Sequence, residues 1–307
     1  MRPALLAFAL ALAVAAPAVA QDAKDTPKPK AAQDIIDAAP ASAWRTLDPA
    51  NTLYMELPAG RVVIELAPGF APGHVANIKA MAKGGFWDGL DIYRSQDNFV
   101  VQWGDADADD PDKAKAFPAG TKTHLPAEFT REAEGLHFDR LPDVDGWAPQ
   151  VGFADGFPAA RDPATGRAWI AHCYGVVGAG RNNAPDSSIG AELYAVIGQA
   201  PRALDHQLTV VGRVVKGMEL LSAIPRGPAP MGFYEDPGLR TPIVSVKLAS
   251  EVPEAQRTPL QLLRTDSQAF IDATEARRNR KDDFYTQPPG HIDLCGVPLP
   301  VREPPTH

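Results

Sequence analysis

The sequence predicts a mainly β protein with few helices. Short runs of β-branched and alternating residues recur along the chain, and turn-forming Pro, Gly, Asn and Asp separate them. Two of these runs, 52–57 and 61–66, flank the turn Pro58-Ala59-Gly60 and are predicted to pair as a hairpin. Helical spacing of apolar residues occurs in two places, 75–86 and 259–283. A further strand is expected at 168–177.

The N-terminal region has the features of a secretory signal. Met1 to Ala20 begins with a positive charge at Arg2, continues with an apolar stretch and ends in the small residues Ala18-Val19-Ala20. The apolar stretch is short for a membrane span, so we expect no membrane association after cleavage and a periplasmic location. Residues 21–45, rich in Ala, Lys, Asp and Pro, are expected to form a flexible leader.

Charge and cysteine content limit the partners and the compartment. The formal net charge is −8 and no basic cluster is present, which argues against a nucleic-acid partner. The periplasm is oxidising, so Cys173 and Cys295 form a disulfide or remain two separate thiols, and the sequence leaves both readings open.

A second hairpin is predicted from the runs 90–94 and 99–103, which a polar turn joins. Alternate residues of a strand point to opposite faces, so Tyr93 and Arg94 are expected on opposite faces. The same alternation separates Phe99, Val101 and Trp103 from Val100 and Gln102. The hairpin can therefore bring Arg94, an aromatic ring and an amide together, although a lone strand arginine is more often a solvated surface residue.

Two features resemble a metal site or a catalytic site, but an acidic surface loop and a structural histidine explain them better. Asp105 to Asp112 has a carboxylate at every second position, but Asp110 and Ala116 stand where a calcium loop needs Gly and Glu. His172 has no second histidine or carboxylate at ligand spacing, so we expect a structural histidine. No metal and no cofactor are expected.

Two segments extend the core elements. Residues 131–167 are punctuated by Pro, Gly and Asp and are expected to form an inserted loop, with a short hairpin as an option. Residues 251–307 are expected to form a C-terminal extension, with a helix over 259–283 and a Pro-rich tail along the surface. The helix is either a structural brace or a partner-docking element.

The hairpin region carries a family signature. Its spacing is Phe-x-Asp-Gly-x-x-x-x-Arg-x-x-x-x-Phe-x-x-Gln-x-Gly-Asp, carried by Phe86, Asp88, Gly89, Arg94, Phe99, Gln102, Gly104 and Asp105. This pattern resembles that of the cyclophilins, and the resemblance covers roughly residues 50–250. It implies further strands at 190–197, 208–214 and 241–248 and a second helix at 217–224. It implies a cyclophilin-like domain over 46–250, an eight-stranded antiparallel β-barrel capped by two α-helices, with the insertion and the C-terminal helical extension added.

The resemblance also implies an activity, peptidyl-prolyl cis-trans isomerisation in protein folding. In the family, an arginine at the position of Arg94 donates a hydrogen bond to the proline nitrogen. The reaction breaks no bond, so it requires no nucleophile and no metal. The implied partners are proline-containing peptides or unfolded proteins, bound by a monomer.

The family's substrate-binding positions map onto Phe99, Val100, Gln102, Glu192, Tyr194, Leu204 and Leu208. Glu192 stands where a Gln is usual, Leu208 where a His is usual, and Ala203 where an aromatic residue is usual. An ion pair of Glu192 with Arg94 would either hold the guanidinium or occupy it. These departures leave a second hypothesis, a non-catalytic cyclophilin-like module that binds proline-containing segments as a chaperone or scaffold.

Overall fold

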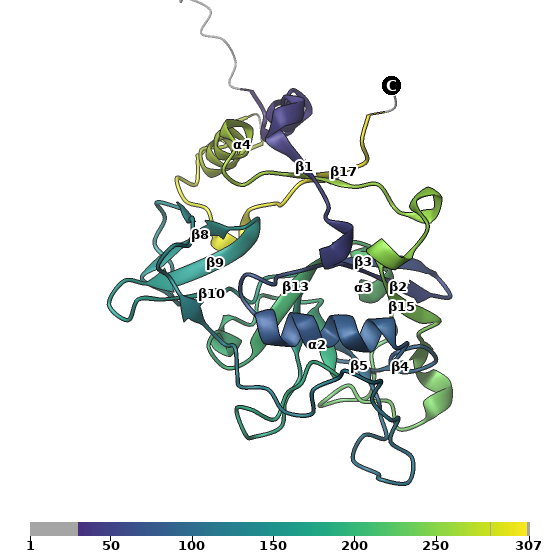
Figure 1. The fold of residues 1–307 in the computed structure, drawn as a ribbon. Coiled ribbons are helices and arrows are strands. Elements are labelled where there is room, and N and C mark those ends of the chain that lie inside the picture. Colours follow the sequence, from purple (N-terminus) through teal and green to yellow (C-terminus); the bar gives the residue numbers. More distant parts are fainter. Residues whose placement is uncertain (1–29, 283, 306–307) are drawn as a thin grey trace, which may run out of the picture.

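The computed structural model describes residues 30–282 and 284–305, so the predicted signal at 1–20 lies outside the described residues. The main sheet is antiparallel and follows the order β14-β4-β5-β12-β11-β13-β3-β2-β15 (Figure 1). Its strands are β2 (Thr52–Leu57), β3 (Gly60–Leu66), β4 (Asp91–Ser95), β5 (Val100–Gly104), β11 (Val176–Ala179), β12 (Leu193–Val196), β13 (Thr209–Lys216), β14 (Thr241–Pro242) and β15 (Ser245–Leu248).

One segment connects the two edges of this sheet. β14 pairs with β4 at one edge, and β15 pairs with β2 at the other. Between them, the Ile243 N–H donates to Leu90 O and the Val244 N–H donates to Glu56 O. Because β14 and β15 belong to one short segment, the sheet curls into a barrel in which this segment takes one strand position. The predicted mainly β, cyclophilin-like fold is confirmed.

Two helices cover the barrel. α2 (Pro72–Lys83) begins with Pro72 in its first turn, where a missing N–H costs nothing, and ends at Lys83 with Gly84 as its C-cap, so it starts and stops earlier than the expected range 75–86. It crosses in front of the strands (Figure 1) and buries Val75, Ile78 and Met81 in the barrel core. α3 (Met218–Ser222) is a single short helix within the expected range 217–224.

The insertion is a second sheet, whereas the sequence indicated a loop. Its order is β6-β10-β9-β8-β7. The strands are β6 (Arg131–Glu132), β7 (Asp139–Arg140), β8 (Gln150–Ala154), β9 (Phe157–Asp162) and β10 (Arg167–Ile170). This sheet lies beside the barrel (Figure 1) and shares a second core with the C-terminal extension, in which Phe153 packs edge-on against Phe270 at 4.9 Å between ring centroids.

The expected strand 168–177 is divided between the two sheets. β10 ends at Ile170 in the second sheet, and β11 begins at Val176 in the barrel. The residues between them include Cys173, which is disulfide-bonded to Cys295 of the C-terminal extension. The run of apolar residues concealed this break because both strands are buried.

The two ends of the described chain meet in a third sheet, of order β1-β16-β17. β1 (Trp44–Thr46) pairs with β16 (Gln261–Leu263), which pairs with β17 (Val301–Arg302). The last part of the predicted flexible leader is thus ordered, since α1 (Ala32–Asp37) precedes β1. The expected helix over 259–283 is shorter, because 261–263 is a strand and α4 spans Gln268–Arg278.

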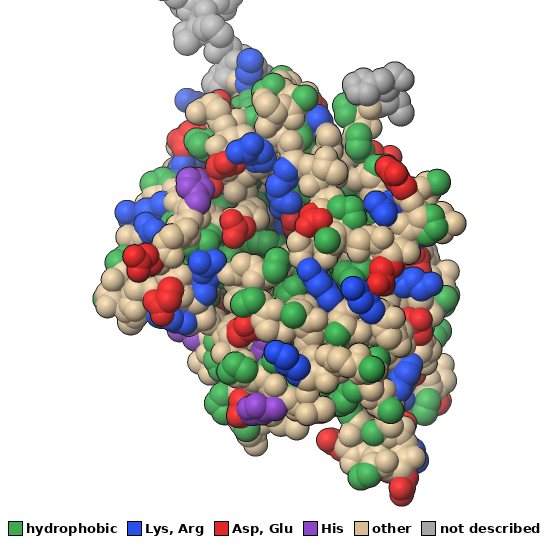
Figure 2. Space-filling model, in the orientation of Figure 1, with side chains coloured by type: hydrophobic (Ala, Val, Ile, Leu, Met, Phe, Trp, Pro, Cys, Tyr) green, Lys and Arg blue, Asp and Glu red, His purple; other side chains and the backbone are tan. Residues whose placement is uncertain are grey.

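The face of the molecule that carries α2 mixes acidic and basic side chains, and neither charge forms a continuous patch there (Figure 2). Beneath the surface, Glu65 of β3 lies between two arginines, 2.6 Å from Arg45 Nη1 and 3.1 Å from Arg213 Nε. This buried cluster ties β1 to the barrel. Among the described residues, no helix has both the length and the apolar composition to cross a membrane.

Candidate functional site

A cavity of about 730 Å³ opens beside the β4–β5 hairpin. All eight residues that the sequence assigned to catalysis or substrate binding line it. They are Arg94, Phe99, Val100, Gln102, Glu192, Tyr194, Leu204 and Leu208. They come from β4, from β5 and β12 together with the residue before each, and from the segment before β13, so the barrel brings distant parts of the sequence to one place.

A bulge in β4 changes the face on which one side chain lies. The β4–β5 register shifts between Ile92 and Arg94, and Arg94 stands opposite Gln102. Tyr93 and Arg94 therefore both line the cavity, and the expectation that they face opposite ways was wrong. Strict alternation could not reveal this extra residue.

The Arg94 guanidinium is held by neutral acceptors. Nε donates to Met231 O at 2.8 Å, Nη1 donates to Gln102 Oε1 at 3.0 Å, and Nη2 donates to Gln96 Oε1. Arg94 as a whole residue is 9% exposed, and its guanidinium carbon lies 4.7 Å from the ring centroid of Phe233. Burial lowers the pKa of Arg94, an effect that Tyr93 opposes. These contacts use three of the five N–H groups of an arginine and leave two for a ligand.

A hydrogen-bonded chain links Arg94 to Glu192 without direct contact. Gln102 accepts from Arg94 through Oε1 and donates through Nε2 to Tyr93 Oη at 2.6 Å. The Tyr93 hydroxyl donates to Glu192 Oε2, and the Asp105 N–H donates to Glu192 Oε1 at 2.9 Å. The expected Arg94–Glu192 ion pair is absent from the described structure, because Tyr93 and Gln102 stand between the two charges.

Glu192 is the titratable group of this chain. Burial raises the pKa of its carboxyl to about 7, and the nearby charges of Asp105 and Asp109 act in the same direction. The hydrogen bonds from Tyr93 and the Asp105 N–H partly oppose this rise. The acid and its carboxylate are thus both populated near neutral pH.

The opposite wall of the cavity is apolar. Val100, Tyr194 and Val196 form a buried cluster, against which Phe99 and Leu208 pack. Phe99 precedes β5 and lies with Val100 instead of on the face of Val101 and Trp103, contrary to the expected alternation. The Phe99 ring centroid is 5.6 Å from the Arg94 guanidinium carbon, so the apolar wall adjoins the cation.

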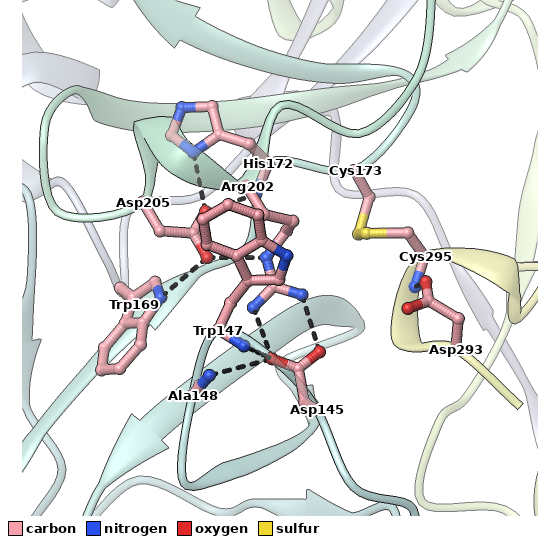
Figure 3. Close-up of polar contacts among 10 residues, drawn as sticks. All are labelled: Asp145, Trp147, Ala148, Trp169, His172, Cys173, Arg202, Asp205, Asp293 and Cys295. Carbon is pink, nitrogen blue, oxygen red and sulfur yellow. Dashed lines mark hydrogen bonds and ion pairs between the residues drawn. A yellow bond between two sulfur atoms is a disulfide. The ribbon is translucent and has the colours of Figure 1, made fainter.

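A polar network lies behind this wall (Figure 3). His172 Nε2 is 2.9 Å from Tyr194 Oη, and His172 Nδ1 is 3.0 Å from Asp205 Oδ1. Asp205 also accepts from Arg202 Nε at 2.7 Å. His172 is a satisfied buried histidine, as expected, but its carboxylate partner comes from a distant part of the sequence.

The sequence did not identify three residues of the site. Met231 and Phe233 reach Arg94 from the loop before β14, where Arg94 and Phe233 form an isolated bridge. Tyr93 stacks on Phe233 at 6.0 Å between ring centroids and holds Gln102. No local pattern in the sequence indicated where this loop would dock.

Comparison with known proteins agrees with this geometry. Residues 52–248 match the family described as "Cyclophilin type peptidyl-prolyl cis-trans isomerase/CLD". A probable peptidyl-prolyl cis-trans isomerase of Brucella suis is 30% identical over 185 residues, covering 59% of this chain and 74% of the relative, and one of Brucella abortus is 29% identical over the same length and coverage.

The structural comparison extends beyond the barrel. The crystal structure of the cyclophilin AquaCyp293 from Hirschia baltica is similar with a TM-score of 0.64 and 25% sequence identity, over 84% of this chain and 92% of that one. The family match alone spans well over half of the chain. The chain therefore belongs to the cyclophilin-type peptidyl-prolyl cis-trans isomerase family.

Proposed function

We propose that the protein accelerates rotation about X-Pro peptide bonds and that Arg94 is the catalytic residue. The observation that carries this proposal is the position of the Arg94 guanidinium, fixed by neutral acceptors at the edge of an apolar wall. A proline ring would lie on the wall formed by Phe99, Val100, Tyr194 and Leu208, which leaves its nitrogen within reach of the free N–H groups.

The chemistry follows from the amide bond. Its rotation barrier is ~18–20 kcal/mol, because the C–N bond has partial double-bond character. As the bond twists, the proline nitrogen loses conjugation and gains a lone pair, so a hydrogen bond to it is stronger in the transition state than in the ground state. A rigid cation with no carboxylate partner in the described structure suits this role, since its charge stays available.

The test is the cis-to-trans exchange of an Ala-Pro peptide, measured for the wild type, Arg94→Ala and the control Arg280→Ala. Arg280 is exposed and pairs with Asp282 far from the cavity. We expect the wild type and the control to accelerate exchange and Arg94→Ala to lose about 100-fold or more in kcat/KM, the size seen when a transition-state donor is removed. Equal activity of all three would exclude the role of Arg94.

A second function, proline-peptide binding without catalysis, is favoured by one observation. The Gln102 amide already bonds Arg94 through Oε1 and Tyr93 through one of its two N–H groups, so it offers a peptide backbone fewer positioning contacts than an unengaged amide would. Peptide binding detected by NMR without any acceleration of exchange would support this function over the first.

We also propose that the protein acts in the periplasm. The Cys173–Cys295 disulfide supports this location, because such bonds persist in oxidising compartments. Fractionation of cells expressing the full chain, with thiol labelling before and after reduction, tests it. Recovery in the cytoplasm with both thiols free would contradict the proposal.

A further inference from the structure

A continuous series of buried polar contacts connects the cavity wall to the second sheet. It runs from Tyr194 through His172, Asp205 and Arg202 to Asp145, which lies between β7 and β8. Figure 3 shows the part from His172 to Asp145. Arg202 binds Asp145 with both terminal nitrogens, at 3.0 and 3.2 Å. The charged side chains of Asp145, Arg202 and Asp205 are 3–7% exposed, so this is an internal connection and not a surface ion pair.

These contacts determine which ring nitrogen of His172 donates a hydrogen bond to Asp205. Burial alone would raise the pKa of Asp205, but the bonds from His172 and Arg202 outweigh it and hold this pKa below its usual range. An ionised Asp205 can only accept, so His172 Nδ1 donates to it. His172 Nε2 lies 2.9 Å from Tyr194 Oη, so the ring nitrogen and the hydroxyl are hydrogen-bonded to each other.

The Tyr194 hydroxyl is thereby directed away from the cavity while its ring lines the cavity. The hydroxyl lies close to the backbone of β11, since a Cβ built on Gly178 would stand 2.2 Å from Tyr194 Oη. Its polar partner in the described structure is His172. Without that partner, the hydroxyl must turn or shift to find another, and the ring moves with it because a buried unpaired hydroxyl is costly.

We propose that His172 is a positioning residue that holds Tyr194 as an apolar wall for proline, and that the second sheet supports it through Asp145. This inference rests on the proposed proline-binding function. The insertion is then part of the substrate-binding apparatus, although in the described structure its strands do not line the cavity. A structural histidine alone would affect folding, whereas a positioning residue affects peptide affinity through the Tyr194 hydroxyl.

The test is a double-mutant cycle on peptide affinity. The dissociation constant of an Ala-Pro peptide is measured by NMR titration for His172→Ala, Tyr194→Phe, the double variant and the wild type. We expect His172→Ala to weaken binding about tenfold when the Tyr194 hydroxyl is present, and by less than about twofold when Tyr194→Phe has removed it. Thermal unfolding of all four shows that the folded state is being compared.

Two further measurements separate this inference from the proposed function. The Tyr194 hydroxyl proton should exchange slowly with water in NMR spectra of the wild type and rapidly in His172→Ala, whether or not the protein binds peptide. Asp145→Asn leaves His172 and Tyr194 intact and should weaken peptide binding about threefold. The matched control Asp162→Asn, in the same insertion but outside the network, should leave affinity unchanged.

The outcomes are distinct. A wild type that binds no proline peptide refutes the proposed function, and a slowly exchanging hydroxyl proton would then still support the His172–Tyr194 bond. If the wild type binds peptide, the positioning role is refuted when His172→Ala leaves peptide affinity unchanged, or weakens it equally with Tyr194 and with Tyr194→Phe. The proposed function is unaffected by that result. Equal peptide affinities of Asp145→Asn and Asp162→Asn would show that the second sheet does not support His172 and Tyr194 through Asp145.

Discussion

The amide nitrogen of Gln102 donates to the hydroxyl of Tyr93 at 2.6 Å, inside the cavity where a peptide would lie. Gln102 also accepts from Arg94, and the hydroxyl of Tyr93 occupies one of the two N–H groups that a substrate carbonyl could use. The bulge in β4 is what brings Tyr93 to this position.

Tyr93→Phe should tighten proline-peptide binding about threefold, because it frees a donor worth about 0.5–1.5 kcal/mol while keeping the ring that stacks on Phe233. The measurement is the NMR-derived dissociation constant. The gain should disappear when Gln102→Ala is added. Weaker binding by Tyr93→Phe would indicate that the hydroxyl itself contacts the peptide.

Glu192 should make stability depend on pH. Its pKa in the folded protein, about 7, lies above the ordinary value of 4.5, so the folded state retains this proton longer than the unfolded state. Its contribution is fully present below about pH 4.5 and is lost as the pH rises through 7, by an amount of about 3 kcal/mol. Urea unfolding of the wild type and Glu192→Gln from pH 4.5 to 8 measures this. Identical pH profiles for the two proteins would contradict the assignment.

Cys295→Ser should lower the free energy of unfolding by about 2–5 kcal/mol, because the disulfide joins residues 122 positions apart and restricts the unfolded chain. Thermal and urea unfolding measure the loss. A reducing agent should shift the wild type by a similar amount and leave the variant unaffected. A wild type that does not respond to reduction, despite full thiol accessibility, would show that the bond adds no stability.

Glu65→Ala should lower the free energy of unfolding by about 3–5 kcal/mol, since it leaves the buried Arg213 and the neighbouring Arg45 without their shared carboxylate. The contrast is Glu132→Ala, which removes the exposed partner of Arg167 and should cost about 1 kcal/mol or less. Urea unfolding compares the two. Similar losses in the free energy of unfolding would mean that the Glu65 cluster stabilises the fold no more than the exposed Glu132–Arg167 pair.

The sequence could predict which residues of the site lie near one another where they belong to the same hairpin. Arg94 and Gln102 lie in one ordered motif within a hairpin, so their proximity followed from strand pairing. The positions of Tyr93 and Phe99 did not follow, since a bulge and a turn break the alternation on which the prediction relied. The roles of the eight cavity residues remain predictions until activity is measured.

The parts of the fold that were not predicted depend on distant contacts. The five short strands of the second sheet bury their apolar faces against residues such as Phe270 and Leu294, more than 100 positions later in the chain. Asp145 pairs with Arg202 across 57 positions of the sequence, and Asp205 pairs with His172 across 33. No local periodicity could indicate such a partner, whereas the compact hairpins and α2 required only neighbouring residues.

The pairing of β1 with β16 also constrains the biosynthesis of the protein. Trp44 to Thr46 leaves the ribosome more than 200 residues before its partner Gln261 to Leu263. At typical rates of about 5–20 residues per second, this delay amounts to roughly ten to forty seconds, during which Trp44 lacks the strand that covers it. The β-strand synthesised first is therefore among the last to be paired.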